Sequence, residues 1–188
     1  MSPIFIVISL LWLGWIAYRI FAARDVKAVA ETASRQSRAL YGIPLLIAAV
    51  LLFDTHLGHF LNTRLVPHTP EVAWLGALLT AAGLAFAIWA RVVLGRNWSG
   101  QVTVKEGHEL IRTGPYALSR HPIYTGLVLA LLGTALAVGE MRALIALLLA
   151  VGSFCYKMSL EEAVMRRTFG GAYDDYARQV KALIPFVV

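Results

Sequence analysis

The sequence predicts an all-α integral membrane protein with five transmembrane helices, of which the last two form a helical hairpin. Of its 188 residues, 59% are hydrophobic and 15% are charged, whereas soluble domains average about 45–50% and about 25%. The apolar residues gather in runs of roughly 20, the length that crosses a bilayer. The basic residues gather beside alternate ends of these runs. Composition thus excludes a soluble globule, a disordered chain and a coiled coil.

Three apolar runs, each holding a single charged residue, predict the first three spans. These runs are Pro3–Ala22, Tyr41–Leu61 and Val72–Leu94. The first run is too long for the apolar region of a secretory signal, and no basic residue precedes it. We therefore expect it to be a membrane span rather than a cleaved signal.

The stretch Pro122–Lys157 predicts the helical hairpin. It is 36 residues long, which is too long for one span and suits two short ones. Its interior charges, Glu140 and Arg142, lie at its middle beside Gly139. We expect a tight turn there, at a membrane surface.

Basic residues predict the orientation of these spans. With five spans, fifteen of the 17 basic residues fall on one side, and Arg64 and Arg142 fall on the other. The positive-inside rule makes the fifteen-residue side cytoplasmic, so the N-terminus lies outside and the C-terminus inside. We expect an integral multi-pass protein of the bacterial inner membrane. Orientation and anionic lipid account for the net charge of +6, and no nucleic-acid partner is needed.

Two polar segments flank the hairpin on the predicted cytoplasmic side, Gly95–His121 and Lys157–Val188. The hairpin brings their near ends together at its mouth. There Arg120-His121-Pro122-Ile123-Tyr124 faces Glu161-Glu162, a pattern that indicates a small-molecule site. An interfacial ion pair between Arg120 and one of the two carboxylates explains the same residues. The single cysteine, Cys155, allows no intramolecular disulfide and no cysteine metal cluster, and we expect no metal.

The residues at this mouth resemble the isoprenylcysteine carboxyl methyltransferase family, in its prokaryotic integral membrane branch. The resemblance rests on Gly114-Pro115-Tyr116 followed by Arg120-His121-Pro122-Ile123-Tyr124-Thr125-Gly126, and on Glu161-Glu162 followed by Phe169-Gly170, Tyr173 and Tyr176. It runs from about Leu94 to Phe186. Arg-His-Pro-x-Tyr alone also occurs in membrane sterol reductases and in phospholipid N-methyltransferases.

The length of the chain predicts a single domain, and we expect one membrane domain over residues 1–188. Residues 1–94 hold three spans, and residues 95–188 form a catalytic core with the hairpin 122–157 and a C-terminal tail. The resemblance implies the cofactor S-adenosylmethionine, with S-adenosylhomocysteine as product. The implied cofactor-binding residues are Gln101, His108, Glu109, Leu110, Ile111, Tyr116, His121, Pro122, Ile123, Tyr124 and Glu161.

The resemblance also implies catalytic roles for Arg120, Glu161 and Glu162. Where the family has a substrate-contacting arginine, this sequence has Lys157, which keeps the charge but loses bidentate carboxylate binding. We expect an acceptor that is a lipophilic small molecule or a lipid, entering from the membrane and methylated at a carboxylate. The alternatives are a phospholipid or amine N-methyltransferase, an NADPH-dependent reductase of the sterol-reductase type, and a non-enzymatic membrane scaffold.

Overall fold

The protein is a bundle of long apolar helices with short polar elements at one end. The computed structural model describes residues 3–24, 29–32, 34–54, 58–98, 103–105 and 109–183. In this part of the chain four helices are long and apolar enough to cross a membrane, and a fifth apolar helix is shorter. The four are α1 (Pro3–Ala22), α2 (Arg35–Phe53), α3 (Pro70–Leu94) and α5 (Met141–Phe169), and the shorter one is α4 (Pro122–Val138). The predicted all-helical membrane class is confirmed.

Capping residues decide where α2 and α3 begin. The limits of α1 are those of the first apolar run. The predicted limits of the second, Tyr41–Leu61, are wrong at both ends. The helix α2 already begins at Arg35, because the Ser34 side chain accepts a hydrogen bond from the Ser37 amide, and it ends at Phe53. Thr69 caps α3 in the same way, so that this helix begins at Pro70.

Glycines end the last two apolar helices. After α4, Gly139 has a left-handed backbone with φ +66°, and α5 begins at Met141. The expected end of the hairpin at Lys157 is wrong, because α5 continues to Phe169. The apolar run ends near Lys157, but the residues beyond it are compatible with a helix. The helix ends only where Gly170, with φ +52°, follows.

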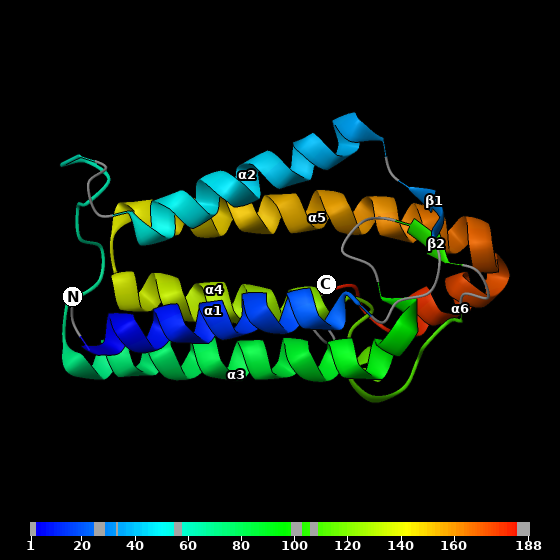
Figure 1. Cartoon of the computed structure of the whole chain (residues 1–188), viewed down its shortest axis with the longest axis horizontal. Coiled ribbons are helices and arrows are strands. Elements are labelled where there is room, and N and C mark those ends of the chain that lie inside the picture. Colours follow the sequence, from blue (N-terminus) through cyan, green and yellow to red (C-terminus); the bar gives the residue numbers. More distant parts are fainter. Residues whose placement is uncertain are drawn as a thin grey trace.

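The long helices form two layers (Figure 1). One layer contains α1, α3 and α4, and the other contains α2 and α5. The closest pair is α3 with α4, where small residues let the two backbones touch. A Cβ added to Gly126 would lie 2.5 Å from the Gly83 carbonyl oxygen, and one on Gly133 would lie 2.5 Å from that of Gly76. This contact fixes the place where α4 begins.

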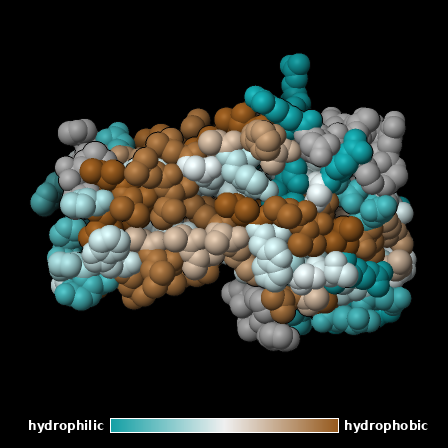
Figure 2. Space-filling model, turned by 60° about the horizontal axis from the view of Figure 1, so that its bottom comes forward, coloured by the Kyte–Doolittle hydropathy of each residue, from teal (hydrophilic) through white to brown (hydrophobic). Residues whose placement is uncertain are grey.

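Apolar side chains cover the middle of the molecule, and polar ones gather toward its two ends (Figure 2). Large apolar side chains point outward from several helices, including Leu10, Leu46 and Leu78, which are 61%, 67% and 66% exposed. Such exposure is costly in water and favourable in lipid. The pattern agrees with helices that cross a membrane.

Short elements gather where α3 ends and α4 begins (Figure 1). The strands β1 (Val29–Thr32) and β2 (Thr103–Lys105) pair antiparallel. The alternation Gln101-Val102-Thr103-Val104 in the sequence predicts a short extended segment. The strand β2 confirms it for Thr103 and Val104, while residues 101 and 102 lie outside the described part of the chain. The same end holds two 3₁₀ turns and a short helix, namely η1 (Gly95–Asn97), η2 (Gly114–Ala117) and α6 (Gly171–Gln179).

Candidate active site

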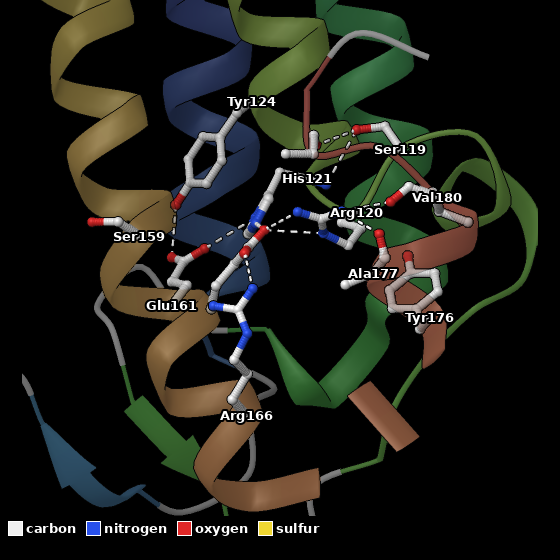
Figure 3. Close-up of polar contacts among 12 residues, drawn as sticks. Ser119, Arg120, His121, Tyr124, Ser159, Glu161, Arg166, Tyr176, Ala177 and Val180 are labelled. Carbon is white, nitrogen blue, oxygen red and sulfur yellow. Dashed lines mark hydrogen bonds and ion pairs between the residues drawn. The ribbon is translucent and has the colours of Figure 1, made fainter. Parts of the chain in front are cut away.

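Arg120 joins three segments at the start of α4 (Figure 3). Its Nε and Nη2 donate to Oε1 of Glu162 on α5 at 3.0 and 2.6 Å. Its Nη1 donates to the carbonyl oxygens of Ala177 and Val180 at 3.1 and 2.6 Å. The Arg120 and Glu162 side chains are only 11% and 12% exposed. A charge-assisted pair this shielded fixes the end of α6 and the middle of α5 relative to α4.

The residues after α6 hold the first turn of α4 from the other side. We name Val180–Leu183 the C-terminal strap. Its Ala182 carbonyl accepts from the His121 amide at 3.0 Å and from the Ser119 hydroxyl at 2.7 Å. The Thr125 hydroxyl donates to the Leu183 carbonyl at 2.5 Å. These bonds fix the backbone that carries His121.

His121 lies between two carboxylates. Its Nδ1 is 3.5 Å from Oε2 of Glu161, and its Nε2 is 3.3 Å from Oε1 of Glu162. Burial by itself lowers the pKa of this imidazole, but the two hydrogen-bonded carboxylates outweigh it and raise the pKa above its ordinary value. Each ring nitrogen faces an acceptor. This arrangement favours the protonated ring, in which both nitrogens donate.

The two adjacent glutamates have different surroundings. Glu161 lines a cavity, where its Oε1 accepts a 2.7 Å hydrogen bond from the Tyr124 hydroxyl and lies 4.0 Å from Nζ of Lys157. Glu162 instead binds Arg120, and its Oε2 lies 3.0 Å from Nη2 of Arg166. Glu161 is thus the carboxylate that faces the cavity, whereas Glu162 pairs with two arginines.

The cavity has a volume of about 350 Å³, within the range of small-molecule sites. Its wall combines charged and aromatic groups with apolar side chains. Lys157 is one of the charged groups in this wall. Its Nζ lies 5.2 Å from the ring centre of Tyr41 and 5.7 Å from that of Tyr124. Tyr124 in turn stacks on Phe154 with 5.1 Å between ring centres. A cation and an aromatic wall therefore lie beside Glu161.

Tyrosines from the polar end complete the wall. The Tyr176 hydroxyl donates to the Tyr116 carbonyl at 2.6 Å, and both residues line the cavity. Burial raises the pKa of Tyr176 to about 12 and that of Tyr116 further. Both hydroxyls are neutral at physiological pH, so they provide polar contacts and ring faces without charge.

Most of the residues singled out in the sequence converge on this cavity. Among the residues singled out in the sequence, those that line the cavity are Glu109, Leu110, Ile111, Tyr116, Arg120, His121, Pro122, Ile123, Tyr124, Lys157 and Glu161. Glu162 contacts the site through Arg120 and His121. The other two, Gln101 and His108, lie outside the described part of the chain.

Sequence reasoning missed the contribution of the first two helices. Trp15 and Arg19 of α1 line the cavity, as do Tyr41, Gly42 and Leu45 of α2. A signal for Arg19 was available, because it is the one charge within the first apolar run. The aromatic and apolar residues carried no signal, since such residues are common throughout membrane helices.

Comparison with known proteins gives this arrangement a family. The phospholipid methyltransferase family model matches residues 72–172. A probable protein-S-isoprenylcysteine O-methyltransferase of Oryza sativa subsp. indica is 29% identical over 137 residues, covering 70% of this chain and 72% of the relative. Protein-S-isoprenylcysteine O-methyltransferase B of Arabidopsis thaliana is 24% identical over 164 residues, covering 79% and 83%.

A solved structure shares the fold. The eukaryotic intramembrane Ras methyltransferase, an isoprenylcysteine carboxyl methyltransferase, aligns over 96% of this chain and 68% of its own, with a TM-score of 0.54 and 20% identity. The chain belongs to the phospholipid methyltransferase family, and the predicted kinship with isoprenylcysteine carboxyl methyltransferases is confirmed. It is a multi-pass membrane methyltransferase. The sterol-reductase and scaffold alternatives are therefore set aside.

Proposed function

We propose that this protein transfers a methyl group from S-adenosylmethionine to the carboxylate of an amphipathic acceptor at the cytoplasmic face of a bacterial inner membrane. The observation that carries the proposal is the position of Glu161. Its carboxylate faces a cavity of about 350 Å³, between a polar end built from the start of α4 and a wall contributed by α1 and α2. One chamber can thus admit a charged cofactor and a lipophilic acceptor.

The residues fit the cofactor. Glu161 offers a carboxylate for the ammonium, and the rings of Tyr116 and Tyr124 offer the electron-rich faces that attract a sulfonium. His121 holds Glu161 in place, and Glu109, Leu110 and Ile111 form part of the opposing rim. Pro122 and Ile123 form the start of α4 at the cavity. Gln101 and His108 keep their proposed roles from the sequence. The product is S-adenosylhomocysteine.

The chemistry asks little of the protein beyond alignment, exclusion of water and management of charge. When bound, S-adenosylmethionine supplies an electrophilic methyl group together with its leaving group. We assign Glu161 to cofactor binding. Arg120 and Glu162 are assigned as positioning residues, because the Arg120 donors point at Glu162 and at two carbonyl oxygens.

The site favours a carboxylate acceptor over an amine. An amine must lose a proton before it can accept a methyl group, and both ring nitrogens of His121 already face carboxylates. Glu161 is engaged by Tyr124, His121 and Lys157. A carboxylate needs no base, and Lys157 attracts it. The matching family description favours a second candidate, N-methylation of a phospholipid amine.

The fold and the charges together support the orientation and span number that we propose. The C-terminal ends of α1, α3 and α5 and the start of α4 share one end of the molecule (Figure 1), and most basic residues lie there. Arg64 and Arg142 belong to the opposite end, where they flank Glu140. By the positive-inside rule the site faces the cytoplasm. We propose that α4 is the fourth of five spans, short but sheltered by α3.

Two measurements on detergent-solubilised protein test the proposal. S-adenosylhomocysteine should raise the midpoint of thermal unfolding, because a ligand that binds only the native state stabilises it, and NADPH should not. The Glu161→Gln variant should lose this response. Labelled methyl transferred to membrane lipids or lipidated peptides should be released as methanol by alkali, as expected of an ester. Alkali-stable label would exclude a carboxylate ester, and no response to S-adenosylhomocysteine would remove the cofactor assignment.

A further inference from the structure

Two cations from distant helices line the same cavity. Lys157 is on α5 and Arg19 is near the end of α1. Like charges repel, so a pair facing one chamber is unfavourable unless an anion is present between them. Glu161, which lies 4.0 Å from Lys157, is the carboxylate expected to pair with the cofactor.

The Arg19 guanidinium lies near the ring of Trp98, and Arg91 lies near the same ring. Cζ of Arg19 lies 5.8 Å from the ring centre of Trp98, and Cζ of Arg91 lies 4.6 Å from the same ring centre. Arg91 donates to the carbonyl oxygens of Ala22 and Gly95, both at 2.7 Å. It thereby joins the end of α1 to the end of α3. This arrangement holds Arg19 at the cavity and gives its exposed side chain a defined direction.

We propose that Arg19 and Lys157 together form the subsite for the anionic head of the acceptor, with Arg19 as a specificity-determining residue. The inference rests on the proposed function and extends it to a residue outside the sequence motifs. A guanidinium supplies the paired donors for a carboxylate that a lysine cannot supply alone. The two cations also repel an ammonium head, so the subsite selects against amine acceptors.

Apolar side chains that could contact the lipophilic part of the acceptor line the same cavity. Trp15 on α1 and Leu45 on α2 line the same cavity as the two cations. Both belong to apolar helices that lie in different layers of the bundle (Figure 1). An acceptor held at Arg19 by its head would therefore have its chain beside Trp15 and Leu45. The partner chemistry is a single-chain amphiphile with a carboxylate head.

Tryptophan fluorescence provides a binding test that is independent of catalysis. Trp15 and Trp98 line the cavity, and a bromine atom quenches indole emission at short range. The probes are a brominated long-chain fatty acid and matched compounds with an amide, an ammonium or a phosphate head, each titrated into the detergent-solubilised full chain saturated with S-adenosylhomocysteine. The variants are Arg19→Gln and Arg19→Lys. The control Arg24→Gln removes an equal charge just beyond α1, at a residue that does not line the cavity.

The expected result is saturable quenching by the fatty acid and weak quenching by the ammonium and amide probes. Arg19→Gln should raise the Kd of the fatty acid about tenfold, as loss of a charge-assisted contact predicts, and Arg19→Lys should restore part of the affinity. Arg24→Gln should leave it unchanged. Equal losses in Arg19→Gln and Arg24→Gln, or wild-type preference for the ammonium probe, would overturn the subsite. Preference for the phosphate probe would assign it to a lipid phosphate instead. Failure of wild type to respond to S-adenosylhomocysteine tests the proposed function separately.

Discussion

The Tyr124 hydroxyl donates a 2.7 Å hydrogen bond to the carboxylate of Glu161. Tyr124 belongs to the first turn of α4, and Glu161 lies well along α5. The bond therefore crosses between two helices at the polar end of the cavity. It aims the carboxylate into the chamber, and it links cofactor affinity to the contact between the two helices.

Replacing Tyr124 by phenylalanine should weaken cofactor binding without unfolding the protein. The ring that stacks on Phe154 at 5.1 Å is kept, and only the hydroxyl is lost. A hydrogen bond to a charged group contributes about 1.5–3 kcal/mol, so the Kd of S-adenosylhomocysteine should rise about tenfold or more. Isothermal titration measures it. Tyr156→Phe removes a hydroxyl on α5 outside the cavity wall and should bind as wild type does. Equal affinity in both variants would mean that Tyr124 does not position Glu161.

Charge and apolar pattern predicted much of this site. The contact between Arg120 and Glu162 was predicted, because the two polar segments that carry them flank one apolar hairpin. The first helix was predicted to the residue, because its ends coincide with the ends of an apolar run. The apolar pattern ends at Lys157, since a polar helix projecting past the apolar region has no hydropathy signal. The end of α5 at Phe169 does have a signal in the sequence, because Gly170-Gly171 break the helix there.

Long-range contacts explain what the sequence does not reveal. The C-terminal strap holds α4 through backbone carbonyls of Ala182 and Leu183, and every residue type has a backbone carbonyl. The different surroundings of Glu161 and Glu162 were hidden for a related reason. Adjacent residues on a helix point about 100° apart, and only the packing of α4 and α6 decides which one faces the cavity.

Breaking the pair of Arg120 and Glu162 should destabilise the fold strongly. Both side chains are shielded, and breaking a buried pair costs up to about 3–5 kcal/mol. The remaining contacts of Glu162 with Arg166 and His121 should keep the loss below the top of that range. Arg120→Gln should cost more than Glu162→Gln, because it also abandons the carbonyls of Ala177 and Val180. Thermal unfolding midpoints in detergent test this order.

Arg178→Gln is the control. It removes an arginine from an exposed pair with Asp175 and should cause little change. The double variant of Arg120 and Glu162 should lose less than the sum of the single losses. Additive losses would show that the two side chains do not interact.

Stability should fall as pH rises above the neutral range. The pKa of His121 in the folded protein is above its ordinary value of 6.5, because two carboxylates outweigh the effect of burial. A raised folded pKa means that the native state holds the proton more tightly. The stabilisation is therefore complete below about pH 6.5 and is lost as pH rises through the folded pKa. Unfolding midpoints between about pH 6 and about pH 9 should show this fall, and His121→Gln should flatten it. An unchanged slope in His121→Gln would assign the titration to another group.

Adding one methyl group where α3 and α4 touch should destabilise the bundle, whereas the same change on α5 should not. In Gly126→Ala the new Cβ would lie 2.5 Å from the Gly83 carbonyl oxygen and 2.7 Å from the Ala87 amide nitrogen, and these backbone atoms can move only if the helices separate. Overpacking of this kind costs about 1–3 kcal/mol. At Gly152, within α5, a Cβ would meet no atom within 4 Å, so Gly152→Ala should be neutral or stabilising by less than about 1 kcal/mol. Unfolding midpoints in detergent compare the two variants. Because α4 carries Tyr124, Gly126→Ala should also weaken S-adenosylhomocysteine binding, whereas Gly152→Ala should not. Equal unfolding midpoints for the two variants would contradict the close contact of α3 and α4.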